Sequence, residues 1–219
     1  MQPLIPPQQD SAIALSTLNV PGGETAVVHD GDLDSLLYVL HGTGTLALDG
    51  TSADLAPLTA ALVLAGEQAT IAGDEEIELV RLTAGSATHL HAPLGARETV
   101  VRVDPAAVQQ AVESRAYQVL FGPHNGSTRA TLFVGFLPPG RAPWHYHLYD
   151  EIVFVPNGPG RLHRDGSEEP LGPRAAFRLR PREVHIVENA SADEEMTVIG
   201  FFTPAGSPSA AYLAEPVPA

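Results

Sequence analysis

The sequence predicts an all-β protein built from two tandem copies of one module, joined by a short helical linker. The 219-residue chain contains 20 glycines and 20 prolines, spread along it as expected of many short strands joined by turns. Residues 37–50 (LYVLHGTGTLALDG) and 153–166 (VFVPNGPGRLHRDG) are identical at six of fourteen positions, at an offset of 116. In the second copy, two histidines two residues apart indicate a strand that points both rings to one face.

The repeat has the same expected structure in each copy: a strand, a Gly-x-Gly turn, a second strand and an Asp-Gly hairpin turn. The identical pairs are Val39/Val155, Gly42/Gly158, Gly44/Gly160, Leu46/Leu162, Asp49/Asp165 and Gly50/Gly166. The offset continues at Pro57/Pro173, Ala60/Ala176 and Glu67/Glu183. We therefore expect a tandem duplication, with one module in residues 1–100 and the other in residues 116–219.

Residues 101–115 are the expected linker. Asp104 followed by Pro105 is an N-cap with proline at the first helical position, and Ala106 to Ser114 reads as a short helix. A C-terminal tail from Ser207 onward is expected to form one or two further helical turns.

A candidate metal site lies in the second module. His145, His147 and Glu151 follow one another at even spacing, so a continuous strand presents all three on one face. His185 follows in RPREVHIVEN. Three imidazoles and one carboxylate suit Mn, Fe, Co, Ni, Cu or Zn. Four ligands on an ion that takes six would leave two positions for substrate, water or dioxygen.

These residues resemble the two sequence motifs of the cupin superfamily. The matching residues are Gly140, His145, His147, Glu151 and Gly158 in the first motif, and Pro181, His185 and Asn189 in the second. The first spacer is one residue shorter than usual, and Arg182 stands where the family usually has glycine. The resemblance implies a bicupin with two jelly-roll (double-stranded β-helix) barrels, at about residues 11–100 and 116–205. It also implies one divalent transition-metal ion held by the four ligands.

The first module is expected to be a degenerate, metal-free barrel. At the offset of 116, the four ligand positions correspond to His29, Gly31, Ser35 and Ala69. One remaining imidazole cannot hold a divalent ion tightly. The first barrel would then serve packing, assembly or the shaping of the second site.

Four residues are candidates for the substrate pocket beside the ion. His163 lies on a hairpin strand and faces either the barrel interior or solvent. Arg178 and Arg180 alternate with apolar residues, so they either attract an acidic substrate or are solvated strand charges. Phe133 belongs to one of two alternating apolar sets, either of which could line a pocket.

Composition excludes several classes of function. Twelve Lys+Arg against 26 Asp+Glu gives a net charge of −14, which argues against nucleic acid and anionic membranes as partners. The absence of cysteine excludes disulfides and thiolate ligands. The N-terminal sequence lacks the features of a signal peptide, and no apolar run is long enough to span a membrane. We expect a cytoplasmic monomer or homodimer that binds a small molecule.

Three functions remain open from the sequence. The first is an oxidoreductase of the dioxygenase type acting on a small organic acid or phenolic compound, with Glu151 as a metal ligand that could also act as a base. The second is a redox-neutral Lewis-acid enzyme, namely an isomerase, decarboxylase or hydrolase of a small polar acid or sugar derivative. The third is a cupin that binds a ligand without catalysis, because a fold does not assign a function.

Overall fold

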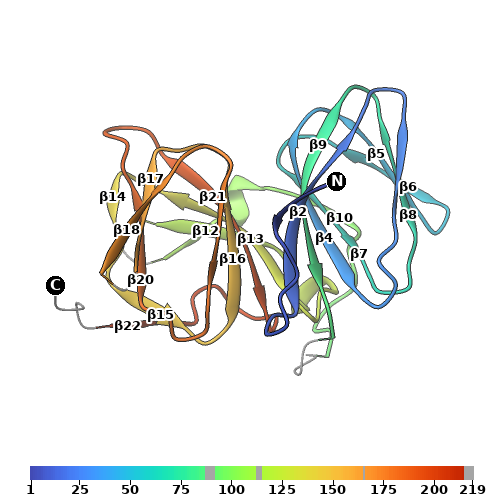
Figure 1. Ribbon diagram of the computed structural model, residues 1–219. Coiled ribbons are helices and arrows are strands. Elements are labelled where there is room, and N and C mark those ends of the chain that lie inside the picture. The colour runs from blue at the N-terminus through green and yellow to red at the C-terminus, as the bar shows by residue number, and fades with distance from the viewer. Residues whose placement is uncertain (87–91, 112–114, 165, 215–219) are drawn as a thin grey trace.

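The computed structural model describes residues 1–86, 92–111, 115–164 and 166–214 and contains two β-barrels that lie side by side (Figure 1). Each barrel has an inner sheet, which faces the other barrel, and an outer sheet. The first barrel's inner sheet has the order β1 (Gln2–Ile5), β2 (Ile13–Val20), β9 (Ile77–Ala84), β4 (Asp34–His41), β7 (Thr59–Val63) and β10 (Val100–Arg102). Its outer sheet has the order β3 (Thr25–Val28), β8 (Ala69–Gly73), β5 (Gly44–Leu48) and β6 (Thr51–Leu55).

The second barrel repeats this plan. Its inner sheet has the order β11 (Gln109–Gln110), β12 (Ala116–Phe121), β13 (Thr131–Leu137), β21 (Met196–Thr203), β16 (Asp150–Val155) and β19 (Ala175–Leu179). Its outer sheet has the order β18 (Ser167–Leu171), β17 (Gly160–Arg164), β20 (His185–Asn189), β15 (His145–His147) and β22 (Ala211–Leu213), and β14 (Gly140–Arg141) also pairs with β20. The named strands of both barrels pair antiparallel, and the predicted all-β, two-barrel fold is confirmed.

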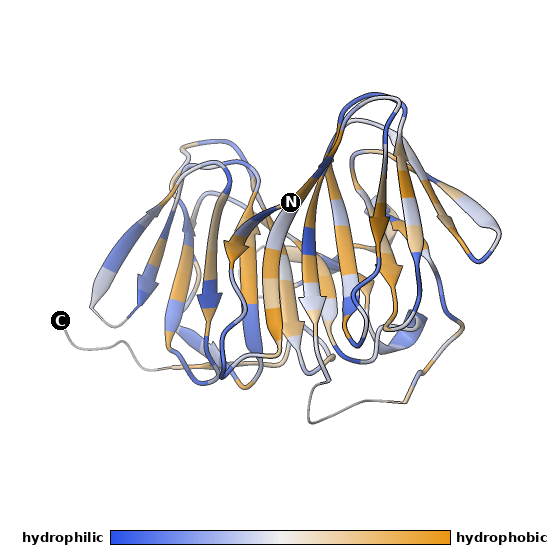
Figure 2. Cartoon of the chain, turned by 45° about the vertical axis from the view of Figure 1, so that its right-hand side comes forward, coloured by the Kyte–Doolittle hydropathy of each residue, from blue (hydrophilic) through white to orange (hydrophobic). Residues whose placement is uncertain are grey.

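The two inner sheets pack face to face and share one hydrophobic core. This inter-barrel core includes Leu36, Tyr38, Leu62, Val80 and Leu82 from the first barrel and Leu132, Val134, Ile152, Phe154, Ile199 and Phe201 from the second. Apolar residues are concentrated in these central strands (Figure 2). Burial of this surface from water ties the barrels together.

Strands of the inner sheets are buried on both faces. In β4, Leu36 and Tyr38 point into the inter-barrel core, whereas Leu37 and Val39 point into the first barrel. This explains the nearly continuous apolar run LLYVL, because a strand covered on both sides needs apolar residues at every position.

The interiors of the two barrels differ. Among the described residues, the first barrel's own core contains 14 buried apolar residues, and that of the second barrel contains nine. The second barrel therefore has room for a cavity, which lies beside the candidate ligands.

Two local expectations were wrong. Instead of a helix over 106–114, the linker forms a single 3-10 turn, η1 (Pro105–Ala107), followed by β11; residues 112–114 lie outside the described part. Asp104 does cap this turn, by accepting a hydrogen bond from the Ala106 amide. The C-terminal tail forms the edge strand β22 rather than helical turns, because its backbone pairs with β15. A second 3-10 turn, η2 (Pro123–Asn125), precedes β13.

No helix among the described residues has both the length and the apolar character that a membrane crossing requires.

Candidate functional site

The four candidate ligands come from three strands of the second barrel. His145 and His147 lie on β15, Glu151 lies at the start of β16, and His185 begins β20. Antiparallel pairing places His145 directly opposite His185, with ring centres 4.3 Å apart. The ring centre of His147 is 5.0 Å from that of His185. The fold thus brings both sequence motifs together.

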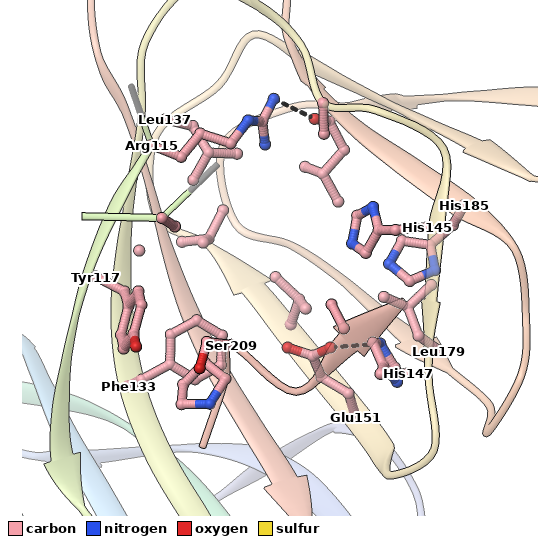
Figure 3. A pocket seen from close by; sticks show the side chains of 18 of the residues that line it. Arg115, Tyr117, Phe133, Leu137, His145, His147, Glu151, Leu179, His185 and Ser209 are labelled. Atoms are coloured by element: carbon pink, nitrogen blue, oxygen red, sulfur yellow. Dashed lines mark hydrogen bonds and ion pairs between the residues drawn. The ribbon is translucent and has the colours of Figure 1, made fainter. Parts of the chain in front are cut away.

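These side chains line one end of a cavity of about 280 Å³ inside the second barrel (Figure 3). Most of the remaining wall is apolar, from strands of both sheets. It includes Tyr117, Phe133, Leu137, Val153, Leu179, Val187 and Val198. Such a pocket, with a few polar groups at defined places, is typical of small-molecule sites.

Backbone carbonyl groups fix the tautomers of all three histidines. The Nδ1 atoms of His145, His147 and His185 lie 2.9, 3.0 and 2.8 Å from the carbonyl oxygens of Pro143, Tyr149 and Glu183. A carbonyl oxygen can only accept, so each Nδ1 carries the proton and donates it. In the neutral rings each Nε2 therefore presents a lone pair, as a metal ligand requires.

The contact between His147 and Glu151 requires a positive charge. The Nε2 atom of His147 lies 2.8 Å from the Oε2 atom of Glu151, yet it is buried and has no hydrogen-bond partner among the described residues. With Nδ1 protonated, a neutral ring places its lone pair against a carboxylate oxygen, which is repulsive. A positive charge between the two atoms, either a proton or a metal ion, relieves that repulsion.

Burial has different effects on the three imidazoles. Burial, with a further contribution from neighbouring His145, lowers the pKa of His185 to about 3. Burial also lowers the pKa of His145. Burial alone would lower the pKa of His147, but the carboxylate of Glu151 outweighs it and raises that pKa. At neutral pH, His145 and His185 are therefore uncharged and suited to bind a cation.

The four donor groups are of the types that bind a borderline divalent ion, although their ligand atoms do not converge on one point. Among the described residues, no three His, Asp or Glu side chains meet the geometry of a finished metal site. Nevertheless, two ligand atoms bound at right angles, each ~2.1 Å from an ion, lie about 3 Å apart. The 2.8 Å between His147 and Glu151 is close to this separation.

Packing around the ligands holds them in place. The ring of Tyr149 stacks on that of His147, with centres 4.1 Å apart and planes 7° apart, and it also stacks on Phe202. Arg182, at the position where the resemblance predicts glycine, adopts a φ of 67°, and its amide donates to the carbonyl of His147. The left-handed turn before His185 is thus kept despite the substitution.

The structure corrects the first-barrel counterpart of His145. In that barrel Val28, rather than His29, lies opposite Ala69, just as His145 lies opposite His185. His29 is exposed, and its Nδ1 lies 2.8 Å from the carbonyl oxygen of Glu67. The offset of 116 therefore changes by one residue within this strand, a slip that sequence comparison alone did not detect.

An ion pair stands in the first barrel beside the counterpart of Glu151. Ser35 accepts a hydrogen bond from the Nε atom of Arg81 at 3.1 Å, and the Arg81 guanidinium pairs with Asp30. Arg81 is 3% exposed and, by strand register, corresponds to Gly200 of the second barrel. The Arg81 guanidinium thus lies beside Ser35, the residue that corresponds to the acidic ligand Glu151 of the second barrel.

The substrate-pocket candidates divide into two groups. Phe133 lines the cavity, and its ring packs against Gly200, where a side chain would collide with it. The other three candidates, His163, Arg178 and Arg180, are not among the residues that line this cavity.

Each of these three side chains points out of the barrel. Strand alternation turns His163 outward, where its Nε2 lies 2.5 Å from Glu188. Arg178 forms a two-pronged pair with Asp150, at 2.7 and 2.8 Å, and Arg180 pairs with Asp10 of the N-terminal segment. The pairs of Arg178 and Arg180 with Asp10 hold the N-terminal segment against the second barrel.

Sequence reasoning missed several residues that line the pocket. Arg115 lies immediately before β12, and Tyr149 lies in the loop between the ligands His147 and Glu151. Ser209 and Leu213 come from the C-terminal segment, whose strand β22 pairs with β15. Only the place of Tyr149 inside the ligand motif could have signalled its role. Arg115 and the tail reach the pocket through tertiary pairing.

A family model described as the cupin domain matches residues 132–202, which span the ligand strands β15, β16 and β20. The second barrel is a cupin domain, and the chain has the bicupin fold. The sequence matches none of the curated proteins.

Solved structures support the two-barrel cupin fold at low sequence identity. AerE from Microcystis aeruginosa is 15% identical with a TM-score of 0.73, and the match covers 89% of each chain. Salicylate 1,2-dioxygenase from Pseudaminobacter salicylatoxidans is 12% identical with a TM-score of 0.74, over 92% of this bicupin and 75% of that chain. Oxalate decarboxylase from Bacillus subtilis, which has Mn(II) centres, is 14% identical with a TM-score of 0.71, over 93% and 71%. At these identities the likeness shows the fold alone.

Proposed function

We propose that this bicupin holds one divalent transition-metal ion in its second barrel, with His145, His147, Glu151 and His185 as ligands. We further propose that it is an oxidoreductase of the dioxygenase type that acts on a small organic acid or phenolic compound. The observation that carries the proposal is the cluster of three imidazoles, each held through Nδ1 by a backbone carbonyl, beside the buried carboxylate of Glu151. The Mn(II) centres of the oxalate decarboxylase support a bound metal, and the salicylate 1,2-dioxygenase of the same fold supports the reaction type.

When bound, an Fe, Mn, Ni or Cu ion would supply electron exchange between an organic substrate and dioxygen. The protein's own residues do the rest. The three Nδ1 hydrogen bonds orient the imidazoles, and the apolar walls exclude bulk water from the ligand cluster. Glu151, the one carboxylate among the described lining residues, lowers the charge of the site and accepts a proton from a substrate hydroxyl.

The first barrel is proposed to be metal-free. Val28, Ser35 and Ala69 stand at the places of His145, Glu151 and His185, and none of them is a strong ligand for such an ion. Arg81 supplies a permanent positive charge beside Ser35, which would oppose the entry of a second cation.

The test is an activity screen that varies both metal and oxygen. Protein loaded with Fe, Mn or Zn is assayed against small organic acids, phenols and sugars, in air and under nitrogen. Turnover only in air with a redox-active ion is the expected result. Turnover with zinc under nitrogen would instead establish a redox-neutral Lewis-acid enzyme. Binding without turnover under every condition would establish a ligand-binding cupin.

A further inference from the structure

One aromatic side chain forms the wall of the cavity on the side away from the ligand histidines. Phe133, on β13, lines the cavity, and Figure 3 shows its ring across the cavity from His145 and His185. It packs edge to face against Tyr117, with ring centres 6.5 Å apart and planes 84° apart, and its centre lies 6.0 Å from that of Phe202. The ring is thus held by two aromatic neighbours, and its position sets how far the cavity extends from the ligands.

A glycine on the neighbouring strand gives this ring its place. Gly200, on β21, is the cross-strand partner of Phe133. A Cβ atom at Gly200 would collide with atoms of the Phe133 ring, so the ring lies over the bare backbone of Gly200. A larger residue at position 200 would push the ring off the sheet and into the cavity, which is the open side. The pair formed by Phe133 and Gly200 therefore sets the depth of the pocket.

The first barrel differs from the second at this same pair. By strand register, Phe133 and Gly200 correspond to Ser16 and Arg81, so the long side chain stands on the other strand. Arg81 is buried. The exchange of side-chain size between the two strands is one point at which the interiors of the two barrels differ.

The size of the cavity matches a single ring. A dry apolar cavity of ~150 Å³ holds one benzene molecule, so a cavity of about 280 Å³ holds one ring with a small substituent. Two linked rings would need ~300 Å³ on the same scale. Leu137 and Val198 also line the cavity, and the hydroxyl group of Tyr117 is engaged with Gln109 at 3.0 Å. This part of the wall therefore offers contact area to an apolar body.

We infer that Phe133, placed by Gly200, is the specificity-determining residue of this pocket: it limits the substrate to compounds whose buried part is a single ring. The inference rests on the proposed role of the cavity as the substrate site. It narrows the phenolic compounds and organic acids of the proposed function to their one-ring members and leaves the reaction open.

The test measures binding of 4-methylphenol and 4-phenylphenol to the protein as purified, by equilibrium dialysis under nitrogen. The two compounds share the phenol group and differ only in the para substituent, a methyl group or a second ring. The second ring adds apolar area and would strengthen binding in an unlimited pocket. We expect wild type to bind 4-methylphenol at least about tenfold more tightly instead, because the second ring does not fit.

Two substitutions change the depth of the pocket in opposite directions. Phe133→Ala opens the space of one ring and should strengthen the binding of 4-phenylphenol by ~10–100-fold. Gly200→Ala pushes the Phe133 ring into the cavity and should weaken the binding of 4-methylphenol at least about tenfold. In the Phe133→Ala background the same Gly200→Ala change should have little effect, because the ring that it displaces is gone. A purely structural role of the two residues would not produce this non-additivity.

Phe136→Ala is the matched control, because Phe136 lies on the same strand and packs against the inter-barrel core instead of the cavity. It should keep the wild-type ratio of the two affinities, and metal content is measured for every variant. Phe133→Leu is a smaller truncation that should shift the ratio in the same direction as Phe133→Ala, and it serves if the alanine variant does not fold.

Equal or tighter binding of 4-phenylphenol by wild type would overturn the inference. So would the absence of 4-methylphenol binding, an unchanged ratio in the Phe133 variants, or an effect of Gly200→Ala that persists in the Phe133→Ala background. The outcome is separable from that of the proposed function. A protein that shows this size limit without oxygen-dependent turnover keeps the inference and loses the dioxygenase proposal. Oxygen-dependent turnover in a protein that prefers the two-ring compound does the reverse.

Discussion

Removal of His185 should abolish metal binding and the stability that the metal confers. His185 is 2% exposed, and its Nδ1 is fixed by the carbonyl of Glu183, so His185→Ala removes a ligand that no neighbouring side chain replaces. At a free metal concentration of 100 times Kd, binding to the folded state alone adds about 2.7 kcal/mol. For 219 residues, an unfolding entropy of about 2.1 cal/mol/K per residue converts this into a rise in Tm of about 6 °C.

The measurements are metal content by elemental analysis and Tm by calorimetry, with and without a chelator. Wild type should contain about one ion per chain and lose about 6 °C when the chelator removes it. His185→Ala should contain almost none, and the chelator should leave its Tm unchanged. Comparing each protein with itself cancels the cost of the cavity that the truncation leaves in the metal-free fold.

His29→Ala is the control, since His29 is exposed in the first barrel and does not occupy the strand position that corresponds to His145. It should keep both the ion and the response to chelator. Retention of one ion per chain by His185→Ala would refute the proposed ligand set. Loss of the ion from His29→Ala would refute the assignment of the site to the second barrel.

Three other predictions concern parts of the fold outside the ligand set. Phe154→Ala, in the fully buried inter-barrel core, should cost about 3–5 kcal/mol and leave a single calorimetric transition; two separate transitions would show that the barrels unfold independently. Arg81→Met leaves Asp30 without its buried partner and should cost on the order of 3 kcal/mol. Its metal content should stay at one ion per chain, because Val28, Ser35 and Ala69 supply no strong ligand, and a second ion would show that the Arg81 charge alone excludes metal from the first barrel. Truncation after Gly206 removes β22 from the pocket wall and should let a chelator strip the metal several-fold faster; an unchanged rate would show that this segment does not limit access.

Several features of this bicupin could be predicted from the chain alone because they depend on local periodicity. The spacing of His145 and His147 placed both rings in one ligand cluster, since alternate residues of a strand face the same side. The expected continuous strand to Glu151 was wrong, because β15 ends at His147 and Glu151 joins the cluster from β16 of the other sheet. The Gly-x-Gly and Asp-Gly turns indicated where strands end, and the offset of 116 revealed the duplication. The four ligand identities come from the motifs and remain a prediction.

The linker and the tail were predicted wrongly because their conformation depends on distant partners. The Asp104–Pro105 pair does start a turn, yet Gln109 and Gln110 then pair with β12 instead of continuing a helix. The sequence AAYLAE has a fair helix propensity, but β15 offers an unpaired edge, so the tail completes the sheet there.

The sequence by itself determined that this protein has two β-modules and that His145 and His147 share one face of a strand, because both follow from the spacing of residues along the chain. Tertiary pairing brought Glu151 and His185 to them, from β16 and β20. The tertiary structure decided which charged residues surround the cavity: it turned Arg178 outward onto Asp150 and brought Arg115 over the pocket. The direction in which a polar side chain of a strand points depends on which face of that strand another sheet covers. Here the packing of the two barrels, through residues far apart in the chain, sets which face is covered.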